Sequence, residues 1–135
     1  MIILRILTLI PFVGVMVAIY AVMGMLGSDL SSVAYSLTAG EVNLELTNGD
    51  MLVLFGLFAL ALEMIKATNT RGWSLGNHGL SMLILILSLG LFLLADGYGT
   101  VTFLMLTTMT LVDVLVGMMV TIVTARRDFG GFSPS

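Results

Sequence analysis

The chain has 135 residues, of which 59% are hydrophobic and only 10% are charged, and its mean hydropathy is +1.14. Soluble domains carry about a quarter charged residues, so this composition indicates a membrane protein. The chain contains no cysteine, which excludes disulfides, thiol catalysis and thiolate metal sites. With a net charge of −3 and no basic patch, nothing points to nucleic-acid binding.

Four apolar stretches reach or approach the roughly 20 residues that a membrane-spanning helix needs. They cover residues 6–27, 51–67, 79–95 and 101–125. We therefore predict an all-α fold class, in which residues 1–135 form one integral membrane four-helix bundle. Consecutive helices of a bundle are antiparallel neighbours by default, which places 51–67 beside both 6–27 and 79–95.

All five basic residues fall on one side of this predicted topology. Arg5 precedes the first stretch, Lys66 and Arg71 lie between the second and the third, and Arg126 and Arg127 follow the fourth. The positive-inside rule therefore predicts both termini in the cytoplasm, with these residues as cytoplasmic anchors. Five of the eight acids fall on the opposite side: Asp29, Glu41, Glu45, Asp50 and Asp96.

The predicted extracytoplasmic loop, residues 28–50, has a pattern of its own. Apolar residues alternate in "VAYSL" and again in "VNLEL", and "TAGE" separates the two segments. This pattern predicts a β-hairpin-like loop, with an irregular polar loop as the alternative. Because an isolated hairpin is only marginally stable in water, we expect it to lie on the bundle's outer face or on a partner. The following "TNGD" predicts a helix cap.

Small residues at helical spacing mark helix contacts in membranes, because lipid offers no hydrophobic drive for helices to associate. The predicted packing residues are Gly14, Ala18, Gly56, Ala59, Gly117 and Thr121. The stripe of the last helix also includes Thr110 and Asp113, so we expect Asp113 to face other helices.

Glu63, His78 and Asp113 are ionisable residues in or beside the predicted spans. Glu63 and Asp113 would each lie about 18 Å below the outer end of their helices, and so near one level. A charged Asp at the bilayer centre costs roughly 3 kcal/mol, which something must offset. The candidates are a proton shared with Glu63, a hydrogen bond from the protonated acid to Thr110 or a carbonyl, or a partner subunit. Glu63, His78, Asp113 and Thr110 therefore either hold the helices together through polar contacts or form a proton relay.

No recognisable catalytic motif is present. Ser81 follows His78 by three residues, but no acid lies at a plausible third position in the sequence. His78 could ligate a haem or chlorin, and the eleven methionines could bind copper. Histidines at helix starts usually serve in caps or interfaces, and methionine is common filler in apolar helices. We therefore expect no enzyme, no cofactor and no metal.

Three segments resemble a family of small four-transmembrane-helix inner-membrane proteins of proteobacteria, which has no assigned activity. They are "EMIKATNTR", "HGLSMLILILSLGLFLL" and "TFLMLTTMTLVDVLVGMMVTIVTARRDFG", within residues 52–130. The matching positions are Glu63, His78, Asp113, Arg126, Arg127 and Asp128, and Asn77 stands where the pattern has an acid. The resemblance implies a multi-pass protein of the bacterial inner membrane and supplies no mechanism.

These observations favour an accessory or assembly subunit of a larger bacterial inner-membrane complex. Such a subunit would contact membrane lipid and bind other membrane-protein subunits, or copies of itself, through its helices. One alternative is a small homo-oligomeric channel or proton-coupled carrier that uses Asp113 and Glu63. Another is a lipid- or pigment-binding membrane protein.

Overall fold

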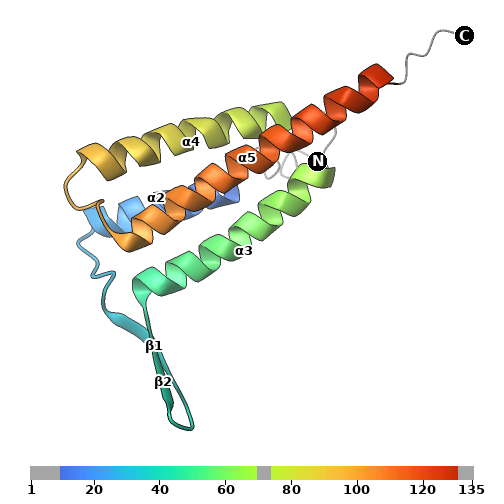
Figure 1. Ribbon diagram of the computed structural model, residues 1–135. Coiled ribbons are helices and arrows are strands. Elements are labelled where there is room, and N and C mark those ends of the chain that lie inside the picture. The colour runs from blue at the N-terminus through green and yellow to red at the C-terminus, as the bar shows by residue number, and fades with distance from the viewer. Residues whose placement is uncertain (1–9, 70–73, 131–135) are drawn as a thin grey trace, which may run out of the picture.

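A computed structural model describes residues 10–69 and 74–130 of the chain. This described part contains four helices and one two-stranded antiparallel sheet (Figure 1). In chain order the elements are α2 (Phe12–Met25), β1 (Val33–Ala39), β2 (Val42–Thr47), α3 (Asn48–Asn69), α4 (Ser74–Leu94) and α5 (Val101–Gly130). The first predicted helix began at residue 6, and its residues 6–9 lie outside the described part.

The predicted bundle of four membrane spans is wrong. Within the described residues, only Gly76–Leu94 of α4 and Val101–Val123 of α5 are long and apolar enough to cross a membrane. Helix α2 has 14 residues, which is about 21 Å of helix against a hydrocarbon core of about 30 Å. Helix α3 is longer, but it carries Asp50, Glu63 and Lys66. The predicted N-in/C-in topology required four spans, so it is not supported either.

Helix α5 is the centre of the fold. It packs against α2, α3 and α4, and Figure 1 shows α3 and α4 on opposite sides of it. Helix α3 therefore packs on α2 and α5, which corrects the default order in which it would lie between α2 and α4. The described core forms where α2, α3 and α5 meet, and it consists of Val13, Val17, Tyr20, Leu52, Ala59, Leu60, Phe103, Leu106 and Met109.

Two glycines permit the close approach of these helices. A Cβ on Gly56 of α3 would lie 2.9 Å from the Sδ of Met109 on α5. A Cβ on Gly14 of α2 would clash with the Cδ1 of Ile84 on α4. The expected partner of Gly14 at the next turn, Ala18, is exposed instead, so this pair does not form a continuous contact within the chain.

The structure confirms the hairpin. Strands β1 and β2 pair antiparallel, with Ala39 opposite Val42 across a two-residue turn. The first turn residue, Gly40, has a positive φ of 63°. In the described part, every residue with a positive φ is a glycine. A positive φ at the first turn position alone is the pattern of a type II′ turn, which matches the twist of paired strands.

The cap predicted from "TNGD" is also confirmed. The backbone N–H and the hydroxyl of Thr47 donate to Oδ2 of Asp50 at 2.9 and 2.7 Å. In return, the N–H of Asp50 donates to Oγ1 of Thr47 at 3.1 Å. This reciprocal capping box satisfies first-turn donors of α3 and joins the helix directly to β2.

The cap generates a prediction about the titration of Asp50. The backbone N–H of Thr47, and then its hydroxyl, stabilise the carboxylate and lower the pKa of Asp50 below its usual 3.8. Its contribution to stability is therefore present above pH 3.8 and is lost as the pH falls through the lower folded-state pKa. In Thr47→Val the pKa should rise but stay below 3.8, because the backbone N–H remains. Carbon-13 NMR titration of the carboxyl measures this change, and Thr38→Val on the exposed strand should leave it unaltered.

Candidate functional site

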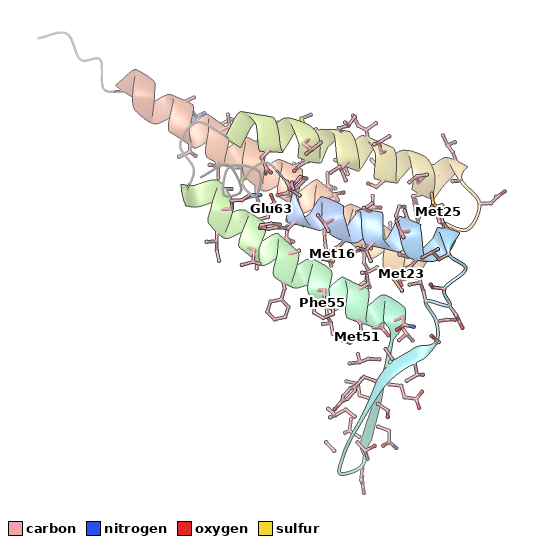
Figure 2. All side chains as sticks on the ribbon, turned by 180° about the vertical axis from the view of Figure 1, so that it is seen from behind. Met16, Met23, Met25, Met51, Phe55 and Glu63 are labelled. Atoms are coloured by element: carbon pink, nitrogen blue, oxygen red, sulfur yellow. The ribbon has the colours of Figure 1, made fainter. Side chains whose placement is uncertain are left out.

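The most buried charged group among the described residues is the carboxylate of Glu63, which is 1% exposed. Its Oε2 accepts the backbone N–H of Phe12, the first residue of α2. Its Oε1 lies 2.7 Å from Nζ of Lys66 and accepts a hydrogen bond from Nδ2 of Asn77 at 2.9 Å. Figure 2 shows Glu63 on α3 beside the end of α2 where that helix begins. One side chain therefore connects α3 with the first turns of α2 and α4.

Lys66 completes this arrangement. Its ammonium donates to the carbonyl of Ile10 at 2.9 Å and to Oδ1 of Asn77 at 3.3 Å, and it lies 4.5 Å from the centre of the Phe12 ring. Only 12% of the side chain is exposed, because these contacts enclose its ammonium group. A buried ion pair tolerates its desolvation only when further hydrogen bonds and close geometry accompany it, and both are present here.

The contact with Phe12 explains how α2 starts. Its N-cap residue is Pro11, which forms no side-chain hydrogen bond to the helix. The first N–H groups of a helix have no partner within it, and the helix dipole favours a negative charge at that end. Glu63 supplies that charge from a different helix. The long-range cap therefore replaces the local cap that the sequence around Pro11 lacks.

A second polar group lies between α4 and α5. Asp113 is buried at 8% exposure, beside Ser81 and within electrostatic range of Glu63, Lys66 and His78. A Cβ on Gly117, one turn further along α5, would lie 2.6 Å from Nδ1 of His78. His78 therefore packs directly on the α5 backbone, which only a glycine at this position permits.

Unlike Glu63, the group of Asp113, Ser81 and His78 is not fully hydrogen-bonded within the described residues. Oγ of Ser81 lies close to Asp113 without the geometry of a regular hydrogen bond, and the buried Nδ1 of His78 has no hydrogen-bond partner there. Thr110, expected as a partner for Asp113, donates to the carbonyl of Thr107 in its own helix instead. The polar contact between α4 and α5 is therefore less closely matched by hydrogen bonds than the Glu63 contact.

Ser81, His78 and Asp113 are the residue types of a hydrolytic triad, and the acid that no sequence position suggested comes from α5. A triad requires one hydrogen bond from serine to histidine and another from histidine to the acid. Neither is formed, because the Ser81 hydroxyl and the His78 Nδ1 have no such partner. Ser81 is also only 3% exposed. The arrangement therefore does not have the geometry of a nucleophile and its base.

The structure brings Glu63, His78 and Asp113 to one end of the helices, in two differently organised halves. The engaged half is Glu63 with Lys66 and Asn77, and the open half is Asp113 with Ser81 and His78. Among the remaining candidates, Arg126 is exposed and Thr121 donates within its own helix to the carbonyl of Gly117. Arg5 and Arg71 lie outside the described residues, and the side chain of Arg127 is not described.

The sequence singled out Asn77 as a departure from a family pattern, and it placed Ser81 by its distance from His78 and, with Ser88, on the inward-facing stripe of residues 79–95. Asn77 and Ser81 are polar residues in the early turns of a helix that is otherwise apolar, and this could have identified them. The partner of each lies on another helix, so the local sequence could not assign it. The role of the Phe12 N–H leaves no mark in the sequence at all.

A separate, open pocket of about 670 Å³ lies at the opposite end of the helices. Three carboxylates line it, from Asp29, Asp50 and Asp96, together with Tyr20 and Tyr98. Hydrogen bonds from the hydroxyl and the N–H of Ser31 lower the pKa of Asp29. The pocket contains no lysine, arginine or histidine, so this end of the molecule is negatively charged.

The engaged half predicts the effect of Glu63→Gln. Removing one partner of a buried ion pair leaves the other charge uncompensated, so we expect a loss of about 3 kcal/mol in the free energy of unfolding. Unfolding in detergent micelles, followed by circular dichroism, measures this loss. Glu63→Gln combined with Lys66→Met should recover part of it, and the exposed Glu45→Gln should have little effect. Equal stability of Glu63→Gln and the unmodified protein would contradict this account of the ion pair.

The close contact at Gly117 predicts that Gly117→Ala moves the imidazole of His78. The chain has one histidine, so the two C–H groups of its ring give the imidazole signals of the chain and can be assigned to it directly. We expect a clear change in the chemical shifts of the ring in Gly117→Ala. Gly90→Ala is the control, because its Cβ would meet nothing within 4 Å. An unchanged histidine signal in Gly117→Ala would show that His78 does not pack on α5.

No family model matches this chain, and neither a curated protein nor a solved structure is detectably similar to it.

Proposed function

We propose that the protein is a membrane-embedded accessory or assembly subunit, which binds other membrane-protein subunits through the outward faces of α4 and α5. The observation that carries the proposal is the apolar exterior of α4. Only 11% of the α4 span is buried inside the protein, against 39% of the α5 span. Large apolar side chains cover the rest of α4: Leu80, Met82, Leu83, Ile86, Leu87, Leu89, Leu93 and Leu94 are exposed.

The distribution of polarity also supports this proposal. The buried polar side chains are Glu63, Ser81, Ser88, Thr107, Thr110 and Asp113. Polar groups inside and apolar groups outside suit a lipid environment, in which polar contacts hold helices together and apolar surfaces face lipid or neighbouring helices. A helix with one narrow face in the bundle has most of its surface left for such neighbours.

The basic residues favour one orientation for the α4–α5 pair. Lys66 and Arg71 precede α4, and Arg126 and Arg127 lie near the end of α5, whereas the turn between the two helices contains none. The positive-inside rule then puts the turn outside the cytoplasm. The bacterial inner membrane as location depends on the family resemblance noted for residues 52–130.

The contacts of Glu63 support a structural role. Its carboxylate is held by an ammonium, an amide and a backbone N–H. These donors belong to α3, α4 and α2, so this one side chain joins three helices. The polar residues therefore act mainly to hold the helices in place.

The proposal predicts that the outward face of α4 is needed for assembly. Leu83→Trp and Leu87→Trp add bulk at positions that are 51% and 57% exposed. Lipid tolerates such bulk, whereas a packed helix interface does not. We expect both variants to lose most of the partner that co-purifies with the protein in native lipid particles. Phe58→Trp on α3, at a position 71% exposed, is the matched control and should retain it.

Two results would contradict the proposal. The first is an unmodified protein that migrates as an isolated monomer in native lipid. The second is proton flux into proteoliposomes that contain the purified protein alone, with loss of that flux in Asp113→Asn. The second result would favour the channel or carrier instead.

A further inference from the structure

The β1–β2 hairpin extends away from the helices instead of lying on them. Figure 1 shows it leaving the bundle where α3 begins and running across the direction of the helices. Every residue of β1 is exposed. The expected position on the bundle's outer face is therefore wrong, and the hairpin's own chemistry must indicate what covers it.

The strand register gives the hairpin two different faces. Successive residues of a strand point to opposite faces, and directly paired residues share one. One face holds the pairs Tyr35–Leu46, Leu37–Leu44 and Ala39–Val42, and the other holds Ser36–Glu45 and Thr38–Asn43. One side of the sheet is therefore apolar and the other is polar and acidic.

The apolar face is uncovered along most of its length. Tyr35, Leu37, Val42 and Leu44 are between 47% and 65% exposed. A two-stranded hairpin is marginal in water, and contiguous exposed apolar residues mark a contact surface. An environment that covers one face and solvates the other would stabilise it.

The base of the hairpin is fixed to the helices. Leu46, on the apolar face, is half-buried, whereas its neighbour Glu45, on the polar face, is exposed. Residue Thr47 ends β2 and Asn48 begins α3, so no linker separates sheet from helix. Because the hairpin runs across the direction of the helices (Figure 1), it would lie along the surface of a bilayer that α4 and α5 cross.

The charges at this end select the kind of surface. Glu41 and Glu45 lie on the hairpin, which projects from the end of the helices where Asp29, Asp50 and Asp96 line the pocket, and no basic residue occurs between residues 6 and 65 of the sequence. Anionic headgroups or an acidic partner would be repelled by these carboxylates. A zwitterionic lipid surface would not, and tyrosine suits the boundary between headgroups and acyl chains.

We propose that the hairpin lies flat on a zwitterionic membrane surface, with Tyr35, Leu37, Val42 and Leu44 at the boundary of headgroups and acyl chains. The inference rests on the membrane insertion of α4 and α5 proposed above. The capping box at Thr47 and Asp50 couples the hairpin to α3, so the lipid contact also sets the position of α3 at the surface.

The experiment uses single-cysteine variants, which are unambiguous because the chain has no cysteine. Leu37→Cys labels the apolar face, and Thr38→Cys labels the polar face one residue away. Each carries a nitroxide label, and the full-length protein is placed in phosphatidylcholine nanodiscs. Collision rates with oxygen, which is enriched in lipid, and with a water-soluble nickel chelate are compared. We expect a severalfold higher oxygen-to-nickel ratio at Leu37→Cys than at Thr38→Cys.

A third label at Leu87→Cys, on the exposed face of α4, tests membrane insertion of the helix separately from the lipid contact of the hairpin. If Leu87→Cys is in lipid but Leu37→Cys is as accessible to nickel as Thr38→Cys, the hairpin inference is overturned and membrane insertion stands. If Leu87→Cys is itself accessible to nickel, membrane insertion fails and the hairpin inference fails with it. Spin–spin broadening at Leu37→Cys that disappears on dilution with unlabelled protein would mean that a second copy covers the face, which also overturns the inference.

Discussion

The fold depends on the requirement that a buried carboxylate be matched by donors. Glu63 meets this requirement by collecting a backbone N–H from α2, an ammonium from its own helix and an amide from α4. A buried carboxylate without such partners costs several kcal/mol. The position at which α2 begins and the direction from which α4 enters therefore follow from one side chain. This is also how α3 and α4 are connected although they pack on opposite sides of α5.

Asp113 presents the same problem at the neighbouring helix and is treated differently. It lies beside Ser81 and near His78, yet the His78 Nδ1 and the Ser81 hydroxyl have no hydrogen-bond partner in the described chain. The early turns of α4 serve both groups, because Asn77 reaches Glu63 while His78 packs on Gly117. A rigid ion-pair network and a less constrained polar contact thus share one helix.

Outside the bundle, the same separation of polar and apolar groups is repeated at a larger scale. Helix α4 has a narrow polar face toward α5, with Ser81 and Ser88 buried, and an apolar face elsewhere. The hairpin divides its residues between two faces in the same way. Asp29, Asp50 and Asp96 lie at the end from which the hairpin projects, whereas Lys66 and Arg126 lie toward the other ends of α3 and α5. This distribution suits the proposed membrane environment of α4 and α5.

Local patterns in the sequence determined the hairpin, the capping box at Thr47 and Asp50, and the approximate extent of the three later helices, because each depends on neighbours within a few residues. Apolar content alone overcounted the membrane spans, since it ignores that α2 is short and that α3 carries three charged residues. Only the tertiary structure decided that α5 is central, that Asn77 and the Phe12 N–H satisfy Glu63, and that Lys66 contacts Ile10 and Asn77. These outcomes depend on which side chains from distant segments fit together, and the periodicity of a single helix carries no information about its neighbour.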